Sequence, residues 1–182
     1  MSPVLPFKRN SDILDRIRKQ GGRTAEDTQY LQLVTVNIGE VQFAVDALSV
    51  AEILIAPPLI AVSASSPLLS GVVNVRGNII PVFDVRSRIG AAAPGVKPAL
   101  AEDERRLLIF RSSDGLLGMI VDDVSLRLAD GRVPARPPEG VILMAGCARV
   151  AEIGEKLFPL LEIEVLLTAD ERKSLAEVRS SY

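Results

Sequence analysis

Short runs in which apolar and polar residues alternate fill most of this chain, a pattern typical of half-buried β-strands. The clearest example lies within 71–86, where a β-branched run leads into Arg76 and a second apolar run leads away from the turn. Gly77 and Asn78 accept a positive φ at little cost, so we expect a β-hairpin that presents Arg76 beside a tight turn. Pro81 cannot donate a ladder hydrogen bond, which predicts an edge strand or a bulge at that position.

The same pattern predicts further strands on both sides of this hairpin. They cover 31–38, 41–45 and 52–55 before it, and 106–110, 116–121, 124–128, 144–153 and 157–163 after it. Short helices are predicted at 12–19, 46–50, 84–89 and 169–179, three of them capped by Ser11, Asp46 and Thr168. Many short strands with tight turns, and no alternation of strands with helices, favour an all-β fold that is closed or partly closed.

By composition the chain has three parts. Residues 1–30 are a polar N-terminal extension, partly disordered or carrying a short helix, which is either a solvated arm or a docking helix for a partner. Residues 31–168 hold the strands, and the loop at 91–105, with its prolines, glycine and charge cluster, separates them into two groups. We therefore expect two small barrels that share an interface, followed by a C-terminal helix and tail at 169–182.

Charge and composition narrow the classes of partner. The 21 basic and 23 acidic side chains nearly cancel, and only 4% of the residues are aromatic, so the chain lacks both the field and the stacking surfaces that nucleic acid requires. The uncharged stretch 53–75 is broken by prolines and Gly71, which predicts no insertion into a membrane. The N-terminus has no unbroken apolar core like that of a signal peptide, so we expect a cytoplasmic protein.

Candidate chemistry is sparse. The sequence has no histidine and one cysteine, which excludes His-dependent triads and Cys/His zinc sites. Cys147 lies in an apolar run and is expected to be a buried, inert thiol. The carboxylates at Asp122, Asp123 and 102–104 are interpreted as solvated turn and loop charges, because neighbouring strand residues point to opposite faces. We expect no enzyme, no cofactor and no metal site.

The hairpin resembles the signature of the CheW-like family of bacterial chemotaxis coupling proteins. The matching residues are Gly71, Asn74, Arg76, Gly77, Pro81, Asp84 and Val85. Segments 50–53, 67–71, 118–124 and 160–163 are similar to further segments of the family and occur in the same order. The resemblance covers about residues 31–168.

This resemblance implies two intertwined, five-stranded SH3-like barrels with a role in signal transduction. It implies a non-catalytic adaptor that couples the cytoplasmic tips of methyl-accepting chemoreceptors to the regulatory domain of a CheA-type histidine kinase, in receptor arrays at the inner face of the membrane. The alternative is a single-partner or inhibitory CheW-like module in a non-flagellar chemosensory pathway.

The resemblance also carries partner-binding positions to this chain. These are Val50, Glu52, Ile53, Gly71, Asn74, Arg76, Gly77 and Val124. Glu52 and Arg76 match a pair that forms a salt bridge at a partner-binding surface, and the alternative is a structural ion pair that holds a strand against the turn. The apolar and small members have a second interpretation as plain core. The run 55–59 and Arg127 depart from the family pattern, which predicts a different choice of partner.

Overall fold

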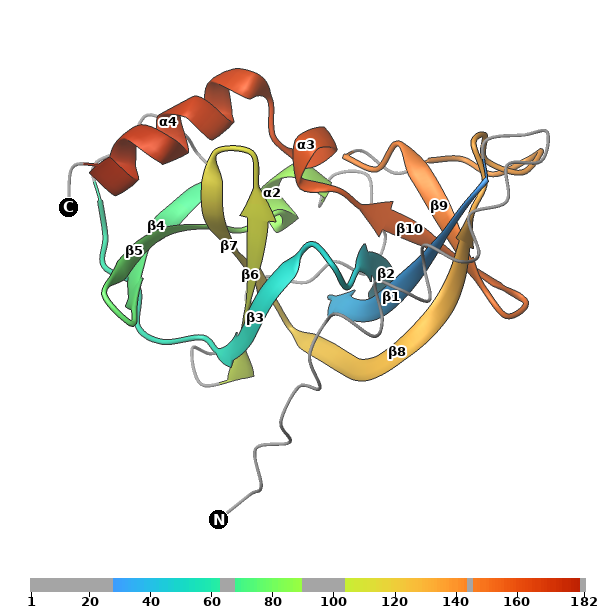
Figure 1. Cartoon of the computed structure of the whole chain (residues 1–182), viewed down its shortest axis with the longest axis horizontal. Helices are drawn as coiled ribbons and strands as arrows, with labels where there is room; N and C mark the ends of the chain where they lie inside the picture. The colour runs from blue at the N-terminus through green and yellow to red at the C-terminus, as the bar shows by residue number, and fades with distance from the viewer. Residues whose placement is uncertain (1–27, 63–67, 90–103, 144–145, 181–182) are drawn as a thin grey trace, which may run out of the picture.

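The computed structural model describes residues 28–62, 68–89, 104–143 and 146–180, and their strands form two groups (Figure 1). One group closes into a barrel in the order β1-β2-β10-β9-β8. Its strands are β1 (Gln29–Ile38), β2 (Val41–Asp46), β8 (Asp123–Val133), β9 (Arg149–Ile153) and β10 (Lys156–Leu161). The predicted all-β fold with two five-stranded groups is therefore confirmed.

The second group is a sheet in the order β3-β6-β7-β5-β4. Its strands are β3 (Val50–Ile55), β4 (Leu69–Val75), β5 (Asn78–Phe83), β6 (Arg106–Ser112) and β7 (Gly115–Val121). The chain thus leaves the barrel after β2, builds the whole sheet, and returns to the barrel with β8 (Figure 1).

The loop at 91–105 does not divide the two groups, so that prediction is wrong. Strands from both sides of the loop pair with each other: β3 lies beside β6, and β5 lies beside β7 with Val82 opposite Gly118. The physical reason is that strand pairing depends on residues far apart in the chain, whereas loop composition reports only that a segment lies at the surface.

The central hairpin forms as predicted, with Val75 opposite Asn78. The positive φ angles fall on Arg76 at 53° and Gly77 at 87°, so the turn lies one residue earlier than expected. Positive φ at both central residues gives the backbone twist that suits a two-residue β-hairpin turn.

Pro81 lies neither at an edge nor at a bulge, in contrast to the prediction. Its strand β5 has β4 on one side and β7 on the other, and the irregularity in the β4–β5 ladder falls opposite Val82 and Phe83. The ladder between β5 and β7 pairs Val82 and Phe83 only, so the missing N–H of Pro81 falls outside it.

Three helices occur in the described parts of the chain: α2 (Arg86–Ile89), α3 (Ile163–Leu166) and α4 (Ala169–Ser180). None of them is both long and apolar enough to cross a bilayer. The helix predicted at 46–50 is wrong, because residues 47–49 form a turn in which the Leu48 N–H donates to Asp46 Oδ1 at 3.0 Å. The helix predicted at 12–19 lies outside the described residues.

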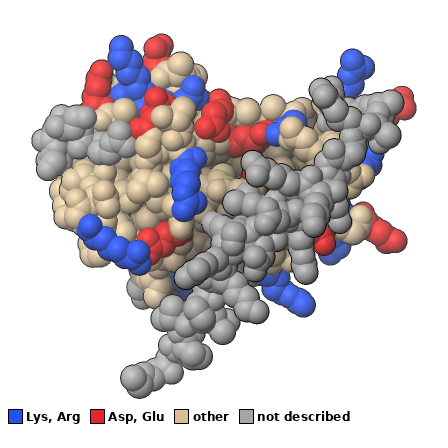
Figure 2. Space-filling view, in the orientation of Figure 1, with Lys and Arg blue, Asp and Glu red and all other residues tan. Residues whose placement is uncertain are grey.

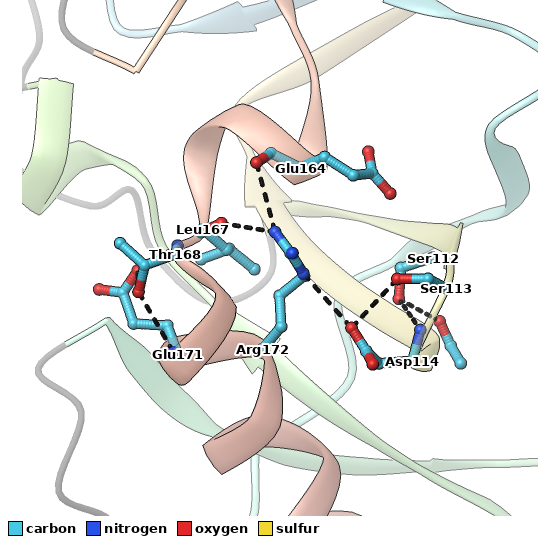
Figure 3. A network of polar contacts seen from close by, with 9 residues as sticks. Ser112, Ser113, Asp114, Glu164, Leu167, Thr168, Glu171 and Arg172 are labelled. Atoms are coloured by element: carbon cyan, nitrogen blue, oxygen red, sulfur yellow. Dashed lines mark hydrogen bonds and ion pairs between the residues drawn. The ribbon is translucent and has the colours of Figure 1, made fainter.

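The C-terminal helix α4 begins with the predicted cap. The Glu171 N–H donates to Thr168 Oγ1 at 3.2 Å, and the Thr168 N–H donates to Glu171 Oε2 at 2.8 Å, which together make a capping box. Arg172 then ties the helix to the β6–β7 turn: it donates to the Leu167 carbonyl at 2.7 Å and pairs with Asp114 at 3.3 Å (Figure 3). Although α4 follows the barrel in sequence, it packs beside the sheet (Figure 1).

The largest apolar cluster is shared by the barrel and the sheet. Phe43 from β2 and Phe83 from β5 are both fully buried in it, and Leu175 of α4 joins them. Two smaller clusters fill the barrel around Leu33 and the sheet around Ile109. Barrel and sheet therefore bury apolar side chains against each other in this shared cluster.

The chain between β3 and β4 covers the outer edge of β4. Ile60 and Val72 exchange two backbone hydrogen bonds, of 2.8 Å and 2.9 Å. Gly71 lies beside this contact with φ at 149°, and a Cβ atom there would lie 2.6 Å from the Ile60 carbonyl oxygen. This approach of two backbones therefore requires glycine at position 71.

Replacing Gly71 with alanine should destabilise the protein by more than ~1 kcal/mol, because backbone strain adds to the clash with Ile60. Urea unfolding followed by circular dichroism measures the change. Gly77→Asn is the matched control: φ is also positive there, nothing lies within 4 Å of an added Cβ, and asparagine tolerates this conformation. Equal unfolding midpoints for Gly71→Ala and the parent protein would contradict the close approach.

Candidate protein-binding site

Glu52 and Arg76 form an ion pair at the exposed end of the sheet. Arg76 Nη2 lies 2.7 Å from Glu52 Oε1. Glu52 comes from β3 and Arg76 from the turn that follows β4, and these two strands are the outermost of the sheet. The pair therefore depends on the curl of the sheet, which brings its two edges together.

The two partners of this ion pair differ in exposure. The Arg76 side chain is 78% exposed and that of Glu52 is 26% exposed. A guanidinium group has five N–H donors, and the contact with Glu52 uses Nη2. Arg76 can therefore keep this bond and still donate to a carboxylate or carbonyl of another molecule.

Asn74 holds the turn that presents Arg76. Its Oδ1 atom accepts the Gly77 N–H at 2.9 Å, and Asn78 donates to the Val75 carbonyl at 3.5 Å. Among the non-glycine residues that the structure describes, Arg76 alone has a positive φ. The turn thus fixes the direction in which the Arg76 side chain leaves the sheet.

The eight residues predicted to bind partners separate into two sets. Glu52, Asn74, Arg76 and Gly77 meet around the hairpin turn and are at least partly exposed. The other four lie in or against the protein interior: Val50 and Ile53 pack partly buried against the shared cluster, Val124 belongs to that cluster, and Gly71 is buried. For Val124 the interpretation as core is confirmed.

Apolar side chains are exposed near both edge strands that carry the ion pair. Ile55, the last residue of β3, is 67% exposed, and Ile60, which bridges to β4, is 52% exposed. Elsewhere on the face seen in Figure 2, acidic and basic side chains are interspersed and form no large area of one sign. Arg127, the other departure from the family pattern, is exposed on β8.

Asp122 is a partly buried residue that bridges two elements, and its interpretation as a solvated turn charge is wrong. The side chain is 15% exposed, accepts the Gly39 N–H at 2.5 Å and pairs with the guanidinium group of Arg86. Its neighbour Asp123, the first residue of β8, is exposed. Residues 102–103 lie outside the described residues.

Arg86 is the polar residue that the sequence analysis missed. It lies on α2, is 8% exposed, and donates to Asp84 at 2.9 Å as well as to Asp122. The Asp-x-Arg spacing at 84–86 indicates the bond between Arg86 and Asp84, whereas no local pattern indicates the bond between Arg86 and Asp122. Within the described ranges, no group of three potential metal ligands occurs.

Cys147 is buried, which confirms the predicted position of its thiol. Burial raises the pKa of the Cys147 thiol from 9.0 to about 11, and the negative charge of Glu162 adds to this effect. The thiol is therefore protonated at neutral pH and is a poor nucleophile.

A closed five-stranded barrel joined to a second five-stranded sheet makes this a small all-β protein, and such a fold does not by itself specify a function. The family model of the CheW-like domain matches residues 32–171. Since this is more than half of the chain, the protein belongs to the CheW-like family, and the resemblance drawn from the sequence is confirmed.

Relatives and a solved structure agree with this assignment. A Rhizobium etli protein named Probable chemotaxis protein CheW is 28% identical over 146 residues, which cover 79% of this chain and 91% of that protein. Chemotaxis protein CheW of Klebsiella aerogenes is 25% identical over 163 residues, which cover 88% and 95%. The scaffolding protein TtCheW from Thermoanaerobacter tengcongensis has the same fold, with a TM-score of 0.62 and 20% identity over 79% of this chain and 96% of that one. By family, the chain is a CheW-like domain, similar to chemotaxis proteins.

A double-mutant cycle on Glu52→Ala and Arg76→Ala should give a coupling energy of ~0–1 kcal/mol, because the pair is largely solvated. Urea unfolding of the parent, the two single variants and the double variant measures it. The coupling should shrink in 1 M salt, which screens exposed charges. A coupling of several kcal/mol that persists in salt would show that the pair holds the fold together.

Cys147 should react with Ellman's reagent at pH 8 only when the protein unfolds. With a pKa of about 11 the folded thiol is about 10⁻³ ionised at pH 8, against about a tenth in the unfolded chain, where the pKa is 9.0. Since the folded state holds this proton more tightly, stability is retained below about pH 9 and falls as the pH rises toward about 11. Rapid labelling of the native protein at pH 8 would contradict this.

Proposed function

We propose that the protein is a non-catalytic adaptor that couples the cytoplasmic tips of chemoreceptors to the regulatory domain of a CheA-type histidine kinase. The observation that carries this proposal is the Glu52–Arg76 pair, which forms at 2.7 Å on an exposed hairpin turn. The family resemblance assigns partner binding to these two positions. The proposed place of action is a receptor array at the inner face of the membrane.

The surface around this pair has the composition of a protein-binding site. Arginine and large apolar side chains are enriched where protein interfaces gain most of their binding energy. Arg76 supplies a directed charge, and Ile55 and Ile60 supply exposed apolar area on the neighbouring edges. A partner with a carboxylate beside an apolar patch would match this arrangement.

The proposed coupling needs no reactive group. An adaptor changes the activity of a kinase when its binding free energy differs between two states of the assembly. This requires two partners to be held in a fixed relative arrangement, and a barrel joined to a sheet through a shared core offers a rigid support for it.

The second candidate is a single-partner module that competes with a complete coupling protein. The exposed Ile55 favours this candidate, because it begins the run 55–59 that departs from the family pattern. Such a module would bind the kinase or the receptor, but not both.

The ternary complex decides between these functions. We expect the purified protein to bind a CheA-type regulatory domain and a receptor tip at the same time, and Arg76→Ala to weaken binding to one partner at least tenfold, or ~1.4 kcal/mol, in calorimetry. Arg132→Ala is the matched control, because Arg132 also makes an exposed ion pair, with Glu152 at 2.8 Å, on the barrel.

Each other result has a definite meaning. Binding to the kinase domain alone would support the competitor. Equal affinities for the parent protein and Arg76→Ala, with the fold unchanged, would overturn the assignment of the site. Binding to neither partner would overturn the adaptor function.

A further inference from the structure

Arg86, which is buried, forms an ionic cluster with the partly buried Asp84 and Asp122 at the point where the chain passes from the sheet to the barrel. Asp84 directly follows β5, Arg86 begins α2, and Asp122 is the single residue between β7 and β8. Two of these residues therefore belong to the sheet side, and the third joins the sheet to the barrel.

Asp122 makes two bonds to the barrel and one to Arg86. Its Oδ2 atom accepts the Gly39 N–H at 2.5 Å, its backbone N–H donates to the Asn37 carbonyl at 2.9 Å, and its Oδ1 atom binds Arg86. Gly39 lies in the β1–β2 turn and Asn37 lies on β1. One side chain thus links α2, the end of β7 and the first hairpin of the barrel.

Arg86 is held equally firmly from the sheet side. Its Nη1 atom donates to Asp84 Oδ2 at 2.9 Å, and its backbone N–H donates to Asp84 Oδ1 at 2.9 Å. The guanidinium group is planar, so binding one carboxylate through Nη1 and another through Nη2 fixes the direction from Asp84 to Asp122. The guanidinium group of Arg86 therefore fixes the carboxylate of Asp84 relative to that of Asp122.

The shared apolar cluster does not by itself fix the orientation of the barrel relative to the sheet. Apolar burial holds the barrel and the sheet together but is nondirectional, whereas charge-assisted hydrogen bonds have preferred distances and angles. Buried ion pairs contribute little net stability and can instead select one arrangement among several compact ones.

We propose that Arg86 is a positioning residue whose bonds to Asp84 and Asp122 set the orientation of the barrel relative to the sheet. The consequence for signalling rests on the proposed function. In an adaptor, this orientation determines how a partner on the Glu52–Arg76 surface is placed relative to a partner held elsewhere on the protein. Loosening the cluster should leave each separate partner bound and should impair control of the kinase.

Arg86→Lys is the diagnostic change, because lysine keeps the positive charge and loses the planar fork. Arg149→Lys is the matched control. Arg149 also binds a carboxylate through two nitrogens, at 3.1 Å and 2.5 Å from Glu162, yet both residues follow barrel strands or lie on them. The control therefore removes a similar fork without touching the junction.

The orientation is measured by pulsed electron paramagnetic resonance with spin labels at two exposed turns. Ser113→Cys places a label on the β6–β7 turn of the sheet, and Glu155→Cys places one on the β9–β10 turn of the barrel, both in a Cys147→Ala background. We expect one narrow distance distribution for the parent and for Arg149→Lys. We expect a broadened or shifted distribution for Arg86→Lys.

An unchanged distribution for folded Arg86→Lys would overturn the proposal. If Arg86→Lys does not fold, Asp122→Asn decides the question, since it keeps the size of the side chain and removes the charge that binds Arg86. An unchanged distribution in folded Asp122→Asn would likewise overturn the proposal.

The same variants separate this proposal from the adaptor function. If the adaptor function holds, the affinities of Arg86→Lys for the kinase domain alone and for the receptor tip alone should lie within threefold of those of the parent. The change in kinase activity that the receptor produces should be at least tenfold smaller with Arg86→Lys than with the parent. If the parent binds neither partner, the adaptor function fails, while the distance distributions still test the cluster.

Discussion

The barrel and the sheet are held together by one apolar cluster to which both contribute side chains. Phe43 and Phe83 meet in it, and Leu175 of the last helix covers it. The barrel takes its strands from both ends of the chain, whereas the sheet is built from the segment between them. Closing the barrel therefore requires contacts between residues that are distant in the chain. These contacts become favourable when the segment between β2 and β8 is compact, because the entropy cost of bringing the barrel strands together is then smaller.

Burial gives two similar ion pairs different physical roles. Glu52 and Arg76 meet in solvent at the end of the sheet, where the bond adds little stability and the guanidinium group remains accessible. Arg86, which is buried, meets the partly buried Asp84 and Asp122, where each bond is directional and less exposed to water. In our proposals the exposed pair serves recognition, and the partly buried cluster sets the orientation of the barrel relative to the sheet.

Local features of the chain were predicted well because their causes are local. The hairpin around Arg76 follows from β-branched runs and a turn that tolerates positive φ, and α4 follows from the reciprocal bonds of Thr168 and Glu171. The errors have a common origin. The sequence pattern predicts a solvated Asp122 and a division of the strands at 91–105. Both predictions are wrong because the partners of Asp122 and of β3 lie tens of residues away in the chain.

The sequence by itself determined the all-β class, most strands, the central turn and the family, since side-chain alternation and turn chemistry act within a few residues. Tertiary structure alone decided which strands pair, which of the eight predicted site residues reach the surface, and which charges are buried. The curl of the sheet brought Glu52 to Arg76, and the return of the chain to the barrel brought Asp122 to Arg86. Strand pairing and side-chain burial depend on the packing of the whole chain, so no short segment of the sequence specifies them.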